Sequence, residues 1–263
     1  MTSPSVTLGI DVRDDHVAVL EMQRPPHNFL NPQQVEELAD ALERFEGDPG
    51  VRAVVLCAEG RSFCAGAEFG SGERTAAEGL SITDRLYAAA VRLCAVTTPV
   101  VAAVQGPAIG GGLGLALTAT MRVTCPEARF SANFVKLGIH QGFGISATLP
   151  ALVGASRAAE ILLMGRRYTG EQAVDVGLAD RCVPAEALRE IALEMAGEIA
   201  SGAPLAIESI YRTLRAGLAD QVRDATAHEA AEQDRLSLTS DAAEGIRAVA
   251  ERRPGQFTGE QQP

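Results

Sequence analysis

The sequence predicts an α/β fold, because short apolar segments of strand length alternate with segments of helical periodicity. Two of these segments, residues 51–57 and 100–104, are apolar nearly throughout, as is typical of strands buried on both faces of a sheet. From about Pro184 onward the pattern is almost wholly helical, so we expect a layer of helices after the α/β core.

The first elements follow from turn and capping residues. Residues 6–10 and 17–22 are two apolar segments around a polar turn, which predicts a β-hairpin. A helix is expected after Asn31, with Asn31 as N-cap, Pro32 at the first helical position and Gln34 closing a capping box. Its apolar face is formed by Val35, Leu38, Leu42 and Phe45.

The central elements alternate in the same way. Residues 58–72 form a glycine-rich loop, residues 75–96 are expected to be helical, and the buried strand at 100–104 follows. A turn at Gly106 and Pro107 should then lead into a helix of small residues at 110–120. Short strands are expected at 121–125 and 129–132, and a second capping box at 169–172.

Two regions are expected along the chain. Residues 1–200 would form the core, and residues 201–263 a C-terminal helical region. Apolar residues in that region need a partner surface to cover them. They are Leu205, Ile210, Leu214 and Leu218.

Charge and composition exclude several classes of function. The net charge of −11 disfavours a nucleic-acid partner, and any phosphate-bearing ligand would need a local basic spot. The single lysine, Lys136, gives little basis for Schiff-base chemistry. The five cysteines form no C-x-x-C pair and are expected to be free thiols in a reducing compartment. Without a signal peptide or a membrane-spanning apolar stretch, we expect a soluble, cytoplasmic protein.

Two glycine-rich segments, residues 61–69 and 105–114, are the candidate sites for chemistry. Each follows a buried strand, where ligand sites of α/β proteins tend to lie, and small residues let the backbone approach a ligand closely. Backbone N–H groups from both segments could form an oxyanion hole. The alternative is that both are only tight turns, since the spacing fits neither G-x-G-x-x-G nor a Walker P-loop.

Taken together, the two segments resemble the enoyl-CoA hydratase/isomerase (crotonase) family. F-C-A-G-A-E-F at 63–69 is similar to its F-x-A-G-A-D-[LIF] signature, and Q-G-P-A-I-G-G-G at 105–112 to its N-G-x-A-x-G-G-G signature. Further elements match at 24–28, 166–177 and 252–257, so that the resemblance covers nearly the whole chain.

The resemblance implies a spiral core of ββα units, a C-terminal helical trimerisation region, and a homotrimer or dimer of trimers. It also implies binding of an acyl-CoA thioester, with coenzyme A as part of the substrate and no other cofactor or metal. The oxyanion donors would be the N–H groups of Ala67 and Gly111. The remaining contacts near the thioester would come from Ala65, Gly66, Glu68, Phe69 and Gly110.

Two departures from the family pattern concern the acid–base groups. In the hydratases of the family, two glutamates activate water and protonate the substrate. Those positions are Gly114 and Phe134 in this chain. An acid used by other relatives matches Gly142, so that route is missing too.

Three polar residues remain near the expected thioester. His140 has a suitable pKa range for acid–base work, or it is a loop histidine. Gln141 would orient the substrate, or only bond within its loop. Glu68 replaces the usual aspartate of the family and is expected to have a structural role.

Coenzyme A would meet the loop of Pro26, His27 and Asn28 by the same resemblance. Arg252 and Arg253 would reach the phosphates of coenzyme A in a neighbouring subunit, or remain solvated charges. Three functions fit these residues: lyase or isomerase chemistry on an acyl-CoA through an enolate, acyl-CoA binding without turnover, and hydration with rearranged catalytic groups.

Overall fold

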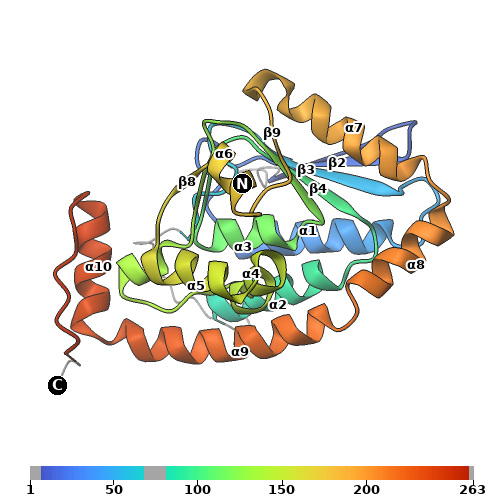
Figure 1. Ribbon diagram of the computed structural model, residues 1–263. Coiled ribbons are helices and arrows are strands. Elements are labelled where there is room, and N and C mark those ends of the chain that lie inside the picture. Colours follow the sequence, from blue (N-terminus) through green and yellow to red (C-terminus); the bar gives the residue numbers. More distant parts are fainter. Residues whose placement is uncertain (1–6, 68–80, 261–263) are drawn as a thin grey trace, which may run out of the picture.

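A computed structural model of the protein describes residues 7–67 and 81–260. A six-stranded sheet has the order β1-β2-β3-β4-β6-β9, and its neighbouring strands are parallel except for the β1–β2 hairpin (Figure 1). The hairpin predicted from the sequence is therefore confirmed. The strands are β1 (Leu8–Val12), β2 (Val17–Met22), β3 (Ala53–Ala58), β4 (Val100–Val104), β6 (Met121–Thr124) and β9 (Arg181–Cys182).

Both faces of the sheet are covered, because successive side chains of a strand point to opposite sides. On β3, Ala53, Val55 and Cys57 pack in one apolar cluster with α7 (Leu188–Ala200). Val54 and Leu56 belong to the larger cluster on the other face. That cluster includes residues of α1 (Pro32–Phe45), α2 (Ile82–Ala95) and α3 (Gly111–Thr118), and Figure 1 shows α7 on the opposite side from α1 and α3.

A second sheet of three strands follows β4. It contains β5 (Pro107–Ile109), β7 (Arg129–Ser131) and β8 (Tyr168–Thr169), with β5 parallel to β7. The prediction that Gly106 and Pro107 turn the chain directly into a helix is therefore wrong. The chain first forms β5, because residues 107–109 find hydrogen-bonding partners in β7. It then enters α3 at Gly111.

The helix ends test the capping predictions. Asn31 caps α1 as expected, accepting a hydrogen bond from the backbone N–H of Gln34. The second half of that capping box is wrong, because the Gln34 side chain donates to the carbonyl of Thr7 instead (2.6 Å). The predicted box at 169–172 is confirmed at the start of α6 (Gly170–Asp175). Helix α2 begins at Ile82, and residues 75–80 of the predicted helix lie outside the described residues.

Helices dominate the remainder of the chain. After η1 (Asn133–Leu137) come α4 (Ile145–Val153), α5 (Ala155–Met164) and, past α6 and β9, η2 (Ala185–Ala187) and α7. The last helices are α8 (Pro204–Leu214), α9 (Leu218–Ser237) and α10 (Ser240–Ala250). Helix α9 packs along α2 and α4, and α10 packs on η1 (Figure 1).

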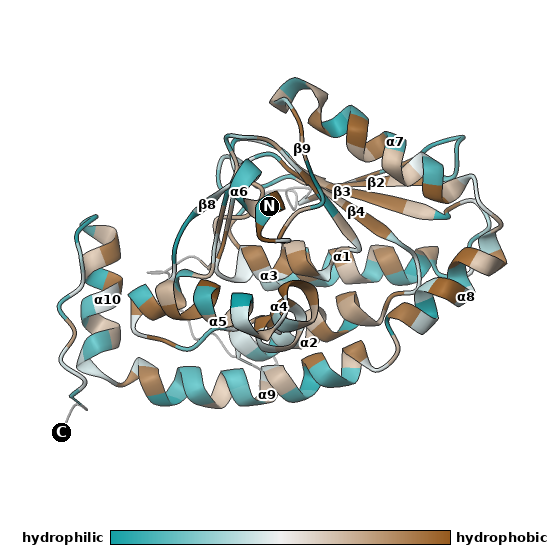
Figure 2. Cartoon of the chain, in the orientation of Figure 1, coloured by the Kyte–Doolittle hydropathy of each residue, from teal (hydrophilic) through white to brown (hydrophobic). Residues whose placement is uncertain are grey.

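Helix α8 exposes apolar side chains. Leu205, Ile210 and Leu214 have exposed fractions of 79%, 60% and 77%, and Figure 2 shows hydrophobic residues along this helix. Leu218, at the start of α9, is half-buried. Among the helices that the structure describes, none combines the length and apolar character needed to cross a membrane.

Candidate active site

The two glycine-rich segments lie against each other at the carboxyl end of β4. The N–H of Cys64 donates to the carbonyl of Pro107, and the N–H of Ile109 donates to the carbonyl of Cys64, each at 3.0 Å. A Cβ atom on Gly66 would lie 2.7 Å from the carbonyl oxygen of Ile109. A Cβ atom on Gly112 would lie 2.1 Å from the carbonyl oxygen of Cys64. Glycine is therefore required at both positions for the segments to approach this closely.

Ala67 and Gly111, whose N–H groups are predicted to form the oxyanion hole, belong to these two joined segments. Gly111 is the first residue of α3, and the first N–H groups of a helix have no acceptor within it. The positive end of the helix dipole lies there as well. Ala67 is exposed and forms a parallel β-bridge with Leu30. In this bridge the N–H of Leu30 donates to the carbonyl of Gly66 (2.9 Å).

Gly114 has no room for a side chain. It is buried in α3, and a Cβ atom on it would lie 2.9 Å from the Cβ and 3.0 Å from the Cδ1 of Phe143. Phe143 is only 2% exposed and has a backbone φ of 64°, a value that non-glycine residues seldom adopt. The space beside Gly114, where the resemblance places the first glutamate, is thus filled by an aromatic ring from another segment.

Phe134, where the resemblance places the second glutamate, is also buried against the start of α3. Its ring atom Cζ lies 3.6 Å from where a Cβ atom on Gly110 would be. Gly110 and Gly114 are four residues apart, so the two phenylalanine rings lie against the same end of this helix. The start of α3 is therefore covered by two buried aromatic rings.

His140 and Gln141 make hydrogen bonds within their own segment. The Nδ1 atom of His140 lies 2.9 Å from the carbonyl oxygen of Gln141, and its ring meets that of His228 edge-on at 5.5 Å. Since a carbonyl only accepts, Nδ1 carries the proton in this contact and Nε2 remains as a possible base. The side chain of Gln141 donates to the hydroxyl of Ser146 (3.0 Å).

A buried carboxylate that the sequence did not indicate holds this segment. Glu229, on α9, is 0% exposed and accepts hydrogen bonds from the N–H groups of Gly144 and Ser146, both at 2.8 Å. Burial raises the pKa of Glu229, and the bonds with Ser146 and Gly144 oppose that shift. An acidic residue inside a polar helix carries no sequence signal that would separate it from solvent-exposed glutamates.

Gln233 lies one turn beyond Glu229 on α9 and holds the beginning of the same segment. Its amide donates to the carbonyl of His140 and accepts from the hydroxyl of Tyr87, each at 2.9 Å. A Cβ atom on Gly142 would lie 2.0 Å from that hydroxyl, so the chain passes directly against Tyr87. Residues 140–146 are therefore held by two side chains on one face of α9.

The loop expected to meet coenzyme A is joined to the first glycine-rich segment. Asn28 is 1% exposed and donates to the carbonyls of Glu59 (2.7 Å) and Ser62 (2.8 Å), so its amide shapes the loop rather than reaching outward. The carbonyl of His27 accepts from the N–H of Ala65 (3.0 Å). The His27 ring is half-buried, and Pro26 is exposed beside it.

The remaining predicted residues lie away from these contacts or outside the described residues. Arg253 pairs with Glu244 and Glu251. The Arg253 guanidinium and the N–H of Gln256 lower the pKa of Glu244 to about 2. Arg252 is exposed at the end of α10. Glu68 and Phe69 lie outside the described residues, and their predicted roles stay predictions.

The cysteines and the potential metal-binding side chains are two further kinds of group among the described residues. All five cysteines are free, as predicted, and burial raises the pKa of Cys64, which lies in the first glycine-rich segment, to about 12. A thiol with so high a pKa is a poor nucleophile at neutral pH. Residues 7–67 and 81–260 bring together no group of three potential metal-binding side chains.

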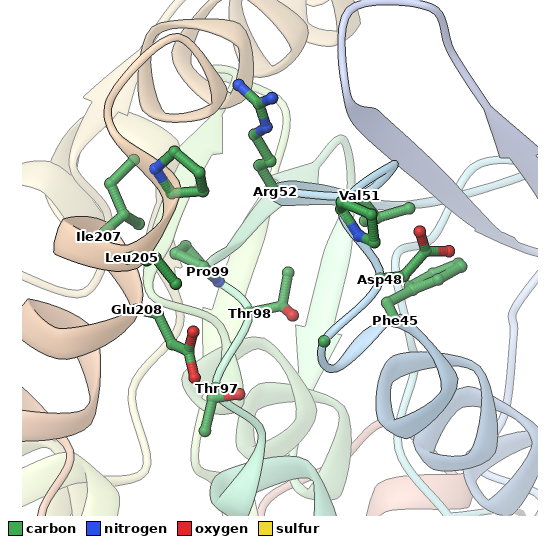
Figure 3. Close-up of a pocket in the computed structure, with 13 residues that line it drawn as sticks. Phe45, Asp48, Val51, Arg52, Thr97, Thr98, Pro99, Leu205, Ile207 and Glu208 are labelled. Atoms are coloured by element: carbon green, nitrogen blue, oxygen red, sulfur yellow. The ribbon is translucent and has the colours of Figure 1, made fainter.

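A separate pocket of about 220 Å³ lies at the opposite end of the strands, near the start of β4 (Figure 3). It is bordered by Thr97–Pro99 before β4, by Asp48 after α1 and by Leu205 of α8. The glycine-rich segments follow the carboxyl ends of β3 and β4, whereas Thr97–Pro99 precede β4, so this pocket is not part of the candidate site.

The sequence matches a family model described as enoyl-CoA hydratase/isomerase over residues 13–261. It is 34% identical over 252 residues to a probable enoyl-CoA hydratase of Bacillus subtilis, covering 94% of this chain and 97% of that protein. It is 37% identical over 257 residues to a putative enoyl-CoA hydratase of Thermus thermophilus, covering 94% and 100% respectively.

Solved structures agree with this match over nearly the full length. An enoyl-CoA hydratase/isomerase from Pseudoalteromonas atlantica superposes with a TM-score of 0.84 at 30% identity, covering 96% of this chain and 100% of that one. An enoyl-CoA hydratase from Mycobacterium avium subsp. paratuberculosis gives 0.83 at 28% identity, covering 97% and 100%.

Proposed function

Because the chain belongs to the enoyl-CoA hydratase/isomerase (crotonase) family, we propose that it binds acyl-CoA and stabilises a thioester enolate without the paired glutamates. The N–H groups of Ala67 and Gly111 form the oxyanion hole in this proposal. The observation that carries it is the junction of the two glycine-rich segments at the first turn of α3. Coenzyme A enters as part of the substrate.

The chemistry that fits best is a reaction in which the substrate supplies its own carbanion. When a group such as carbon dioxide leaves the α-carbon, negative charge moves onto the thioester oxygen. Two fixed N–H donors and the positive end of α3 stabilise that charge without reorganising. Apolar rings in place of the glutamates leave no carboxylate at Gly114 or Phe134 to activate water. Isomerisation through the same enolate would need a proton carrier, for which Nε2 of His140 is the candidate.

A second candidate is an acyl-CoA-binding protein without turnover. The packing of Phe143 against Gly114 favours it, because an aromatic ring at this position can contact an acyl chain but cannot transfer a proton. Hydration with His140 as the acid–base group is a third candidate, and it has less support because that ring bonds within its own loop. Turnover on a series of acyl-CoA substrates distinguishes the three.

Acyl-CoA thioesters should bind far more tightly than free fatty acids. The nucleotide of coenzyme A contributes much of the contact surface, in this proposal through the loop of His27 and through Arg252 of a neighbouring subunit. Titration calorimetry with butyryl-CoA, octanoyl-CoA and octanoate measures the difference. Equal affinity for octanoate and octanoyl-CoA would contradict the proposed function.

The protein should assemble as a trimer or a dimer of trimers. Leu205, Ile210 and Leu214 are too exposed for an isolated chain, and burying them between copies is favourable. Multi-angle light scattering of the wild type, compared with the Leu205→Asp, Leu214→Asp double variant, measures the mass. A stable wild-type monomer would overturn both the assembly and the role given to Arg252.

A further inference from the structure

Phe143 adopts a backbone conformation that it would not keep without support. Both Phe143 and the next residue, Gly144, have positive φ angles, 64° and 74°. The left-handed region is unfavourable for a residue with a Cβ atom, so contacts elsewhere must compensate for it. In this backbone conformation, the Cβ and Cδ1 atoms of Phe143 occupy the space beside Gly114.

Side chains of α9 stabilise the unfavourable backbone conformation at Phe143. Helix α4 begins after Gly144, which has no side chain to cap it, so the N–H groups of its first turn need an external acceptor. Glu229 supplies one from 85 residues further along the chain, bonding Gly144 on one side of the turn and Ser146 on the other. Gln233 fixes the beginning of the same segment through the carbonyl of His140.

We propose that Glu229 is a positioning residue of the acyl-thioester site, acting through Phe143. Its carboxylate holds the turn at Gly144 so that the Phe143 ring forms a water-excluding wall beside Gly114. This inference rests on the proposed function, since it assumes that the acyl group lies at the start of α3. It adds that acyl recognition depends on a carboxylate that does not touch the substrate.

The wall and the coenzyme A loop are separate structures, which makes the inference testable. The Phe143 ring belongs to residues 140–146, which are held from α9, whereas the loop of His27 is held by Asn28 and by the first glycine-rich segment. Loss of the wall should therefore weaken binding of the acyl group and leave binding of coenzyme A alone unchanged. A general loss of stability would not change the ratio of the two affinities in protein that remains folded.

The experiment compares the dissociation constants of butyryl-CoA and coenzyme A by titration calorimetry in folded variants, with folding checked by circular dichroism. Glu229→Gln keeps the size of the side chain but presents an amide N–H₂ to one of the two N–H donors. It should bind butyryl-CoA about tenfold more weakly and coenzyme A with nearly unchanged affinity, because wall contact with the acyl carbons is lost. Phe143→Ala should reproduce this selective loss.

Glu232→Gln is the matched control, since Glu232 lies on the same helix and pairs with Arg235 at its surface. It should change neither affinity. Glu229→Asp, one methylene shorter, replaces Glu229→Gln if the amide variant does not fold, and the same selective loss is expected. If the wild type prefers butyryl-CoA to coenzyme A and the folded Glu229 variant keeps that preference, the positioning role is wrong. If the wild type shows no such preference, the proposed function fails as well.

Discussion

Crotonyl-CoA should be hydrated by this protein far more slowly than by a relative that carries both glutamates. One positioned acid or base typically contributes about 10²–10⁴ in rate, and the resemblance places neither glutamate in this chain. Gly114 has no side chain, and Phe134 is buried against Gly110. The oxyanion hole of the proposal would still polarise the thioester, so a small residual rate is expected.

The loss of enoyl-thioester absorbance measures this rate, with a glutamate-bearing relative as the control. A turnover number similar to that of the control would contradict the proposed absence of acid–base groups. His140→Ala would then show whether the imidazole has taken over their role.

Restoring the glutamates requires space as well as charge. The Gly114→Glu, Phe134→Glu double variant forces a new Cβ atom within 3.0 Å of the Phe143 ring, so it should gain little activity or lose stability. Adding Phe143→Gly removes both the ring and the Cβ atom that would lie 2.9 Å away, and glycine suits the φ of 64° there. The triple variant should hydrate crotonyl-CoA faster than the double, and Phe143→Gly alone is the control. A folded triple variant without any gain would contradict the assignment of Gly114 and Phe134 to the glutamate positions.

Removing the N–H of Gly111 should reduce any turnover on a thioester by about 10²–10³, the effect of losing one oxyanion donor. Proline suits this test, because Gly111 is the first residue of α3 and proline is well tolerated there. A Cβ atom at Gly111 would lie 2.4 Å from the Cδ1 of Leu30. The variant should therefore be made as Gly111→Pro together with Leu30→Ala.

Leu30→Ala alone is the control, since it makes the same space and keeps the N–H. If the wild type binds acyl-CoA without turnover, the carbonyl stretch of the bound thioester is measured by infrared spectroscopy instead of a rate. The double variant should then return the carbonyl stretch toward its value in solution. A folded double variant with unchanged rate and unchanged carbonyl stretch would exclude Gly111 as a donor.

The sequence alone determined the family and the fold. The crotonase-type α/β fold and its C-terminal helices are confirmed, and so are the hairpin, the buried strands and the N-cap of α1. The hairpin, the strands and the N-cap depend on local patterns: period-two alternation, apolar strand-length segments and capping residues. The family came instead from the resemblance of the two glycine-rich segments to its signatures. The same resemblance places the family glutamates at Gly114 and Phe134, and that placement stays a prediction.

Only the tertiary structure decided what fills those positions. No pattern near Gly114 indicates that Phe143 packs on it, and no pattern in α9 separates Glu229 from its solvent-exposed neighbours. The same reason explains the errors at β5, which needed β7 as a partner, and at Gln34, whose side chain found the carbonyl of Thr7. Close packing and hydrogen bonds between distant segments choose among local options that the sequence leaves equal in energy.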